Sequence, residues 1–177
     1  MLEAMTEVTA KSGYAEASVA DVIALAGVSR KTFYEQFRDK EECFLTAYDV
    51  LSDHLVRALV DVGANLRTGP LRRRAQVAAF LGALAKDPAS ARVFMVDVLG
   101  AGPRALKRRE RVNASFGDAV LGDAVGEPVR RAAIVGGVNN VVAGALMESR
   151  MADLLALVDP LAAFVEDALG QGKRPRS

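Results

Sequence analysis

Three helix-start signals lie close together between Ser18 and Asp39, and they constrain the fold more than any other feature of the chain. Ser18, Ser29 and Asp39 each carry a side-chain oxygen that can accept a hydrogen bond from the free N–H groups of a helix start. Gly27 precedes the second signal and supplies the left-handed geometry that closes a helix. The spacing therefore predicts short helices joined by very short turns, which is the layout of a helix-turn-helix.

Apolar residues recur at intervals of three and four along almost the whole chain, and no alternating run long enough for a strand interrupts them. Glycine and proline divide this pattern, and three of the prolines stand in the first turn of an expected helix. The sequence thus predicts an all-α protein of about nine helices, over residues 1–12, 19–26, 30–37, 40–65, 71–86, 89–99, 104–121, 128–150 and 153–170.

The second helix of a helix-turn-helix can enter the major groove of DNA, where its N-terminal residues reach base edges. Arg30 and Lys31 match the acceptor pair of guanine, and Gln36 matches the donor and acceptor of adenine. Thr32 and Tyr34 carry hydroxyl groups that suit phosphates, as do the free N–H groups of the neighbouring first turns. The candidate DNA-binding residues are Ser18, Ser29, Arg30, Lys31, Thr32, Tyr34, Gln36 and Lys40.

The segment GYAEASVADVIALAGVSRKTFYEQFRDKEECFLTAY resembles the DNA-binding domain of TetR-type one-component transcriptional regulators. The resemblance covers Leu2 to about Val50 and rests on the spacing of Gly13-Tyr14, Ala26-Gly27-Val28-Ser29, Thr32-Phe33-Tyr34 and Asp39-Lys40-Glu41. It implies an all-helical homodimer whose first three helices bind a palindromic operator. It also implies that the fourth helix joins them to a larger domain that binds a ligand and dimerises.

Large apolar side chains stand beside abundant alanine and glycine in the middle of the chain, so they could line a space rather than fill one. The Asn139-Asn140 pair interrupts an otherwise apolar helix, and a buried amide without a partner costs roughly 1–3 kcal/mol. A neighbouring helix, a second copy, water or a ligand must therefore satisfy it. The candidate ligand-binding residues are Phe80, Leu84, Phe94, Met95, Val98, Phe116, Asn139 and Asn140.

A mostly hydrophobic effector is expected at these residues, because no charged residue of the segments falls clearly on their apolar face. The basic clusters, Lys107-Arg108-Arg109 among them, are interpreted as solvated helix faces. The alternative is that the large apolar side chains form core and nothing more.

The last helical segment carries an apolar stripe that continues across Pro160, and such a stripe needs a partner. The resemblance implies that the last two helices pair with those of a second copy in a four-helix interface. The candidate dimer residues are Val141, Leu154, Val158, Leu161, Val165 and Leu169. The alternative is that the stripe closes the core of its own chain.

Other classes of protein find little support. The single histidine would have to serve as any catalytic base, and no His/Cys cluster has the spacing of a metal site. The longest nearly apolar run, residues 132–147, falls short of the roughly 20 residues that a membrane span needs. One cysteine and no secretory signal indicate a cytoplasmic protein without a disulfide. No enzymatic activity, cofactor or metal is expected.

The sequence therefore predicts a DNA-binding domain over residues 1–45, a ligand-binding and dimerisation domain over residues 46–170, and a disordered tail over residues 171–177. We interpret the chain as a sequence-specific transcriptional regulator. Its expected partners are double-stranded operator DNA, a hydrophobic small-molecule effector that releases a repressor, and a second copy of the chain. The alternative is a helical small-molecule-binding protein with a vestigial DNA-binding module.

Overall fold

The computed structural model of the protein describes residues 1–148 and 151–170. This part of the chain forms nine α-helices and three short 3₁₀ helices and contains no strand, which confirms the all-α prediction. The helices are α1 (Leu2–Glu16), α2 (Val19–Ala26), α3 (Arg30–Gln36), α4 (Lys40–Ala64), α5 (Pro70–Lys86), α6 (Pro88–Met95), η1 (Asp97–Gly100), α7 (Pro103–Leu121), η2 (Gly122–Ala124), α8 (Pro128–Met147), η3 (Met151–Leu157) and α9 (Val158–Gly170).

The helix ends differ from the prediction mainly where glycine or proline stands inside an expected helix. The first helix continues past Gly13, which forms a kink with φ 80° and ψ 157°. The last expected helix divides into η3 and α9, so that Pro160 stands in the first turn of α9, where its missing N–H breaks no hydrogen bond. The expected helix over residues 89–99 ends at Met95 and continues as η1. The predicted tail, residues 171–177, lies outside the described residues.

The joints between α1 and α4 follow the local signals of the sequence. The Ser18 hydroxyl accepts a hydrogen bond from the Asp21 N–H at 3.2 Å, and the Asp21 carboxylate accepts one from the Ser18 N–H. Gly27 ends α2 in the left-handed conformation with φ 65°. The side chain of Ser29 accepts from the backbone at the start of α3, and that of Asp39 does the same at the start of α4. These caps fix three helix starts in quick succession.

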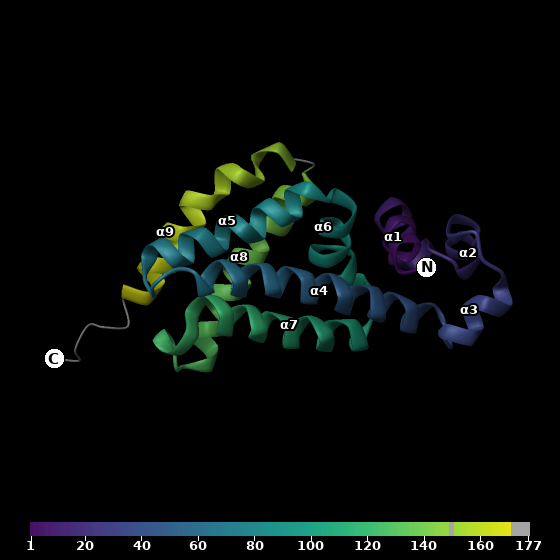
Figure 1. Ribbon diagram of the computed structural model, residues 1–177, viewed down its shortest axis with the longest axis horizontal. Helices are drawn as coiled ribbons and strands as arrows, with labels where there is room; N and C mark the ends of the chain where they lie inside the picture. The colour runs from purple at the N-terminus through teal and green to yellow at the C-terminus, as the bar shows by residue number, and fades with distance from the viewer. Residues whose placement is uncertain (149–150, 171–177) are drawn as a thin grey trace.

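The molecule is elongated, with α1–α3 at one end and α8–α9 towards the other, and α4 runs between the two ends (Figure 1). Helix α4 packs against α1, α5, α6 and α7, while α1 also contacts α6 and η1. One hydrophobic core extends from Met5 and Phe33 near the first end to Leu161 in α9. Cys43 lies fully buried in that core, and burial raises its pKa to about 11. The fourth helix thus shares its core with both ends of the chain.

One buried amide links three helices. The side chain of Gln76 in α5 is fully buried, and its Nε2 donates to the Leu59 carbonyl of α4 at 3.1 Å and to the Ala119 carbonyl of α7 at 2.9 Å. The Ala119 carbonyl belongs to the last turn of α7 and has no partner within its own helix. The Oε1 atom of Gln76 has no hydrogen-bond partner among the described residues. Gln76 therefore ties α4, α5 and the end of α7 together.

None of the helices in the described ranges is both long and apolar enough to cross a membrane.

Candidate functional site

The outward face of α3 gathers most of the predicted DNA-binding side chains. Arg30, Lys31, Tyr34 and Gln36 are exposed, whereas Phe33 on the opposite face is fully buried. The Phe33 ring packs against those of Tyr34 and Phe37, at 5.3 and 5.5 Å between centroids. Helix α3 also lies at the extreme end of the molecule (Figure 1). The predicted readers therefore share one accessible face of a short, anchored helix.

The remaining hydroxyl groups near this face hold the helices in place. The Ser29 Oγ accepts from the Thr32 N–H at 3.0 Å and lies 2.9 Å from the Thr32 hydroxyl, which is half-buried. The Ser18 hydroxyl donates a hydrogen bond to the Asp21 carboxylate.

Lys31 forms an ion pair with Glu35 at 3.9 Å, but both side chains are more than half exposed, so the pair is weak. Lys31 can therefore leave Glu35 at little cost.

Lys40, which the sequence assigns to phosphate binding, is engaged within the chain. Its Nζ donates to the Tyr14 carbonyl at 2.9 Å and to the Ala15 carbonyl at 3.2 Å, and it lies 4.5 Å from the centroid of the Tyr14 ring. These contacts clamp the end of α1 to the first turn of α4. Sequence reasoning missed this role because Tyr14 is 26 residues away, beyond the reach of local patterns.

A row of six aromatic rings connects α1 to the C-terminal half of the molecule. Its five centroid distances lie between 4.7 and 6.5 Å, within the range of interacting rings. Tyr48 and Phe94 are nearly parallel, with 12° between the ring planes. In order, the row consists of Tyr14 of α1, Phe44 and Tyr48 of α4, Phe94 of α6, Phe116 of α7 and Phe80 of α5. The rings thus link five helices without a gap.

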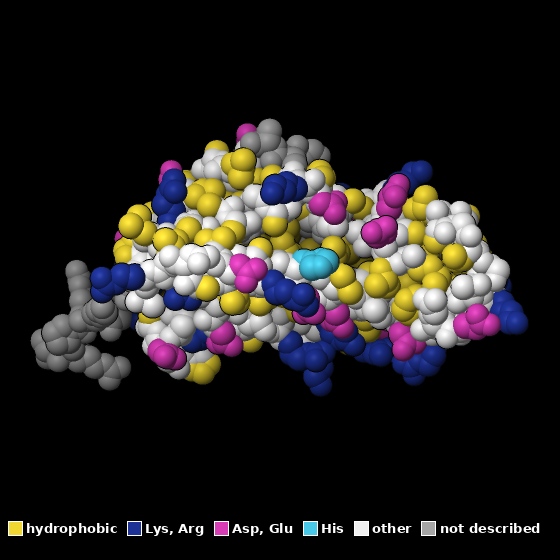
Figure 2. Space-filling view, viewed as in Figure 1, with side chains coloured by type: hydrophobic (Ala, Val, Ile, Leu, Met, Phe, Trp, Pro, Cys, Tyr) yellow, Lys and Arg dark blue, Asp and Glu magenta, His cyan; other side chains and the backbone are white. Residues whose placement is uncertain are grey.

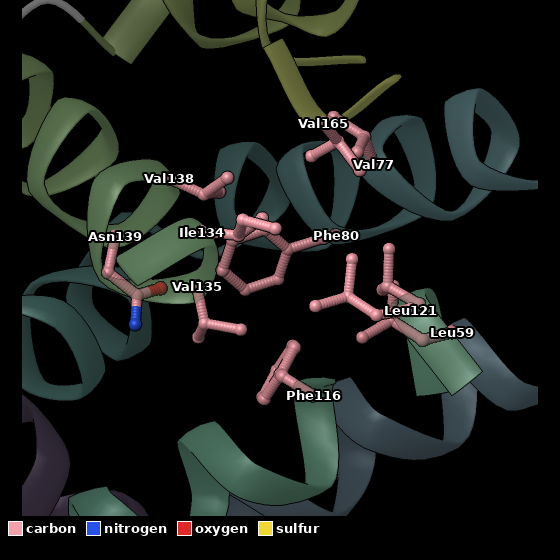
Figure 3. Close-up of a pocket in the computed structure, with 11 residues that line it drawn as sticks. Leu59, Val77, Phe80, Phe116, Leu121, Ile134, Val135, Val138, Asn139 and Val165 are labelled. Atoms are coloured by element: carbon pink, nitrogen blue, oxygen red, sulfur yellow. The ribbon is translucent and has the colours of Figure 1, made fainter. Parts of the chain in front are cut away.

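The far end of the row borders a small cavity of about 50 Å³, lined by side chains of α4, α5, α7, α8 and α9. Phe80 and Phe116 lie across its middle, Leu59 and Leu121 lie at one end, and Asn139 lies at the other (Figure 3). Asn139 is the single polar residue of the lining. A volume of this size holds about one or two water-sized molecules, so a larger ligand must displace side chains.

The structure brings together only part of the predicted ligand set. Phe80, Phe116 and Asn139 line the cavity. Four others, Leu84, Phe94, Met95 and Val98, are buried in the core outside the lining. The last three belong to α6 and η1, which pack against α1. Asn140 is exposed, since it follows Asn139 by 100° around α8. The remaining lining residues, Leu59, Val77, Val120, Leu121, Ile134, Val135, Val138 and Val165, were not among the candidates.

A neighbouring helix satisfies the buried amide of the asparagine pair. The Asn139 Nδ2 donates to the Oδ1 of Asn113 in α7 at 2.9 Å. Asn139 is 9% exposed, so the bond removes a desolvation cost that the isolated amide would carry. Of the four partners that the sequence left open, the structure therefore selects the neighbouring helix.

A wider groove of about 560 Å³ opens between α1, α4 and α6, beside His54 (Figure 2). Three carboxylates, those of Glu3, Glu7 and Asp87, stand on its walls. The lining of the groove is partly polar, whereas that of the 50 Å³ cavity is almost wholly apolar. The apolar cavity is therefore the better candidate for a hydrophobic effector.

The predicted dimer stripe is wrong for most of its residues. Leu154, Val158, Leu161 and Val165 are 0, 8, 4 and 2% exposed, so their side chains pack within their own chain. Helix α9 and η3 contact α5, which covers the stripe. The stripe therefore closes the core of the chain, which was the alternative interpretation. Leu169 is half-buried, and only Val141 is substantially exposed.

A different face of the same two helices is apolar and exposed. Val129, Val141 and Phe164 are 75, 44 and 42% exposed, and Ala133 lies in the shallow groove between α8 and α9. The Phe164 ring packs so closely on Gly137 that a Cβ atom there would lie 3.2 Å from its Cζ. We refer to Val129, Ala133, Gly137, Val141 and Phe164 as the α8–α9 face.

Comparisons with known proteins agree with this geometry. Residues 1–47 match the family described as "Bacterial regulatory proteins, tetR family". No curated protein matches the chain significantly.

Among solved structures, the fatty acid degradation regulator FadR from Bacillus halodurans has a TM-score of 0.81 and 22% identity, over 98% of this chain and 97% of that one. FadR from Bacillus subtilis, solved in complex with stearoyl-CoA, has a TM-score of 0.81 and 18% identity over the same shares. A TetR family regulator from Marinobacter aquaeolei has a TM-score of 0.72 and 20% identity, over 94 and 92% of the two chains. Residues 1–47, which contain α1–α3, thus match the DNA-binding region of the tetR family of bacterial regulatory proteins, and the whole chain has the fold of solved TetR-family transcriptional regulators.

Proposed function

We propose that the protein is a repressor that binds a near-palindromic operator as a homodimer and is released by a hydrophobic small molecule. The observation that carries this proposal is the aromatic row, because it connects the apolar cavity to Tyr14 and hence to the Lys40 clamp beside α3. An effector in the cavity and DNA on α3 would then act on one continuous set of packed rings. Because its proposed target is operator DNA, we expect the protein to act in the cytoplasm.

On the DNA side, α3 enters the major groove and presents Arg30, Lys31 and Gln36 to base edges. Tyr34 and Thr32 contact the phosphates that set the orientation of the helix. Two copies of α3 meet successive major grooves about 34 Å apart, or a multiple of that distance. The exposure of four of these five side chains supports the assignment.

On the ligand side, the cavity of about 50 Å³ must grow before an effector fits. Phe80 and Phe116 lie across its middle, with 5.1 Å between their ring centroids, and the Phe116 centroid lies 6.0 Å from that of Phe94. A ligand chain that displaces Phe116 therefore also displaces Phe94 and the stacked Tyr48 of α4. The stearoyl-CoA bound to FadR of Bacillus subtilis, which shares the fold, supports an effector with a long apolar chain.

The release of DNA requires that the effector bind one arrangement of α4 more tightly than the other. Operator binding that is about 100-fold weaker corresponds to about 2.7 kcal/mol of coupling between the two sites.

The homodimer forms through the α8–α9 face, whose exposed Val129, Val141 and Phe164 replace the buried stripe as the interface.

The test is selection of bound duplexes from a random DNA pool, followed by a panel of apolar compounds read by thermal shift and by operator release. We expect one palindromic sequence and at least one compound that both stabilises the protein and frees the DNA. Phe94→Leu keeps the apolar volume but removes a ring from the row, so it should reduce the effector's influence on DNA while leaving operator affinity nearly unchanged. A protein that selects no operator would contradict the proposal.

A further inference from the structure

Helix α7 turns one charged side chain towards the interior of the bundle. One edge of α7 is held to α4 by the ion pair of Arg108 with Asp49, and the other edge is held to α8 by the hydrogen bond of Asn113 with Asn139. Arg109 lies between these two edges, since successive residues are 100° apart around the helix. Its inward position explains why it is half-buried, whereas Arg111 is exposed.

The Arg109 guanidinium has neither a hydrogen bond nor an ion pair among the described residues. Its positive charge acts on Tyr48 of the aromatic row, because burial raises the pKa of that phenol and Arg109 opposes the rise. A guanidinium presents five N–H donors in a flat fork that matches a carboxylate or a phosphate. A half-buried fork without a partner is therefore a site that an anion can fill.

Arg109 lies in line with the apolar cavity. Asn113 follows it by one helical turn and Phe116 by two, which places Phe116 about 10 Å further along the axis of α7. Asn139 stands at one end of the cavity (Figure 3). Its Nδ2 donates to the Oδ1 of Asn113. Arg109 and Asn113 thus share one side of α7 with Phe116, and Asn113 is bonded to Asn139, the polar residue of the cavity lining.

The surroundings also favour an anion. Lys and Arg side chains gather along the edge of the molecule that α7 forms (Figure 2). Two carboxylates of α4 that face α7 are already paired, Asp49 with Arg108 and Glu41 with Arg104, and Glu110, which follows Arg109, is exposed to solvent. The local field therefore favours negative charge beside this part of α7.

We propose that the effector carries an anionic head group, a carboxylate or a phosphate, which pairs with Arg109, and an apolar chain that enters the cavity between Phe116 and Phe80. This assignment rests on the proposed function and specifies the chemistry of its ligand. It revises the expectation that the apolar face carries no charge, because Arg109 lies on that face.

The test compares three ligands that share one twelve-carbon chain: dodecanoate, dodecyl phosphate and the uncharged methyl dodecanoate. Binding to the full-length protein is measured by calorimetry. We expect at least one of the two anions to bind at least 10-fold more tightly than the ester. The preferred anion identifies the head group as a carboxylate or a phosphate.

Variants test whether Arg109 causes the preference for an anion over the ester. Arg109→Gln should lower the affinity of the preferred anion to that of the ester and leave the ester unchanged, while Arg109→Lys should keep most of the preference. Arg111→Gln is the matched control, because Arg111 is exposed on the same helix. It should retain the full preference. Thermal unfolding of each variant shows that the protein is folded.

Two results overturn the head-group assignment alone: an ester that binds as tightly as both anions, or an anion that binds Arg109→Gln as tightly as the unchanged protein. In either case a compound that still frees the operator leaves the repressor proposal standing. If none of the three ligands binds, the head-group assignment also fails, and the compound panel then decides the repressor proposal independently.

Discussion

The outward face of α3 and the α8–α9 face are both accessible, but they are held in place by different means. Helix α3 has seven residues, of which only Phe33 is buried, and its position depends on the caps and the left-handed Gly27 around it. Helix α8 has twenty residues, and its buried side includes Ile134, Val142 and Leu146. The first surface should therefore be sensitive to backbone changes at the joints, and the second to changes of volume or charge beneath it.

The chemistry of the two surfaces differs in the same way. The face of α3 is polar and needs no cover in solution, whereas the α8–α9 face exposes Val129, Val141 and Phe164. A contiguous apolar surface usually marks an interaction site. The face of α3 thus suits a polyanion, and the α8–α9 face suits a second apolar surface. The following variants test that contrast.

The largest effect should come from Leu161→Glu. Leu161 is 4% exposed within the core, so a carboxylate there is desolvated without a partner and should cost more than about 4 kcal/mol. Circular dichroism should show loss of cooperative folding. Phe164→Glu is the matched change three residues on, at a side chain that is 42% exposed, and it should give a folded monomer in sedimentation. A folded, monomeric Leu161→Glu would restore the stripe as the interface.

Gly27→Ala should have the next largest effect. With φ at 65°, an added Cβ strains the joint between α2 and α3 by about 1–2 kcal/mol. Operator affinity should also fall, because the strained joint no longer holds α3 in its native orientation. Gly82→Ala is the control: the glycine lies inside α5 with open space around it, and the change should be neutral or stabilising by about 0.5–1 kcal/mol. Urea unfolding measures both, and equal effects would refute the role of the left-handed joint.

Lys40→Met should lower stability by about 1–2 kcal/mol in urea unfolding. The substitution keeps the apolar stem but removes two hydrogen bonds to the carbonyls of α1 and the contact with the Tyr14 ring. A variant with unchanged stability but weaker binding of every DNA sequence would return Lys40 to the phosphate role predicted from the sequence.

The smallest effect on stability, within about 0.5 kcal/mol, is expected for Lys31→Met, because its ion pair with Glu35 is exposed and 3.9 Å long. Its effect should instead appear in DNA binding, with a slope of affinity against salt concentration that is smaller by about one. A gel-shift titration at several salt concentrations measures that slope. An unchanged slope would remove Lys31 from the DNA-binding residues.

The contrast between the two regions also explains how much the sequence could predict. Ser18, Gly27 and Ser29 act on N–H groups and dihedral angles within a few residues, so the helix ends and the exposed face of α3 followed from local reasoning. The periodicity of α9 showed that Leu161 needs a partner, but periodicity does not name the partner. In the structure that partner is α5 of the same chain.

The cavity was hardest to predict for the same reason. Phe80, Phe116 and Asn139 come from three helices that meet only in the folded chain, together with residues of two more. The hydrogen bond from Asn139 to Asn113 spans 26 residues and leaves no mark on the local pattern. Arg109 looked like part of a solvated basic cluster until the packing of α7 placed it inward.

Gln76 restricts how α5 can pack in the bundle. Helices packed only through apolar side chains can slide by one turn, about 5 Å, and still bury similar surface. The Gln76 amide makes its two hydrogen bonds only where the Leu59 and Ala119 carbonyls face it together. Any shifted register of α5 would bury the whole amide without partners, so competing packings are penalised far more than the native one is stabilised. Its unpartnered Oε1 fits this view, because a residue kept for uniqueness of the fold need not be the one that adds most to its stability.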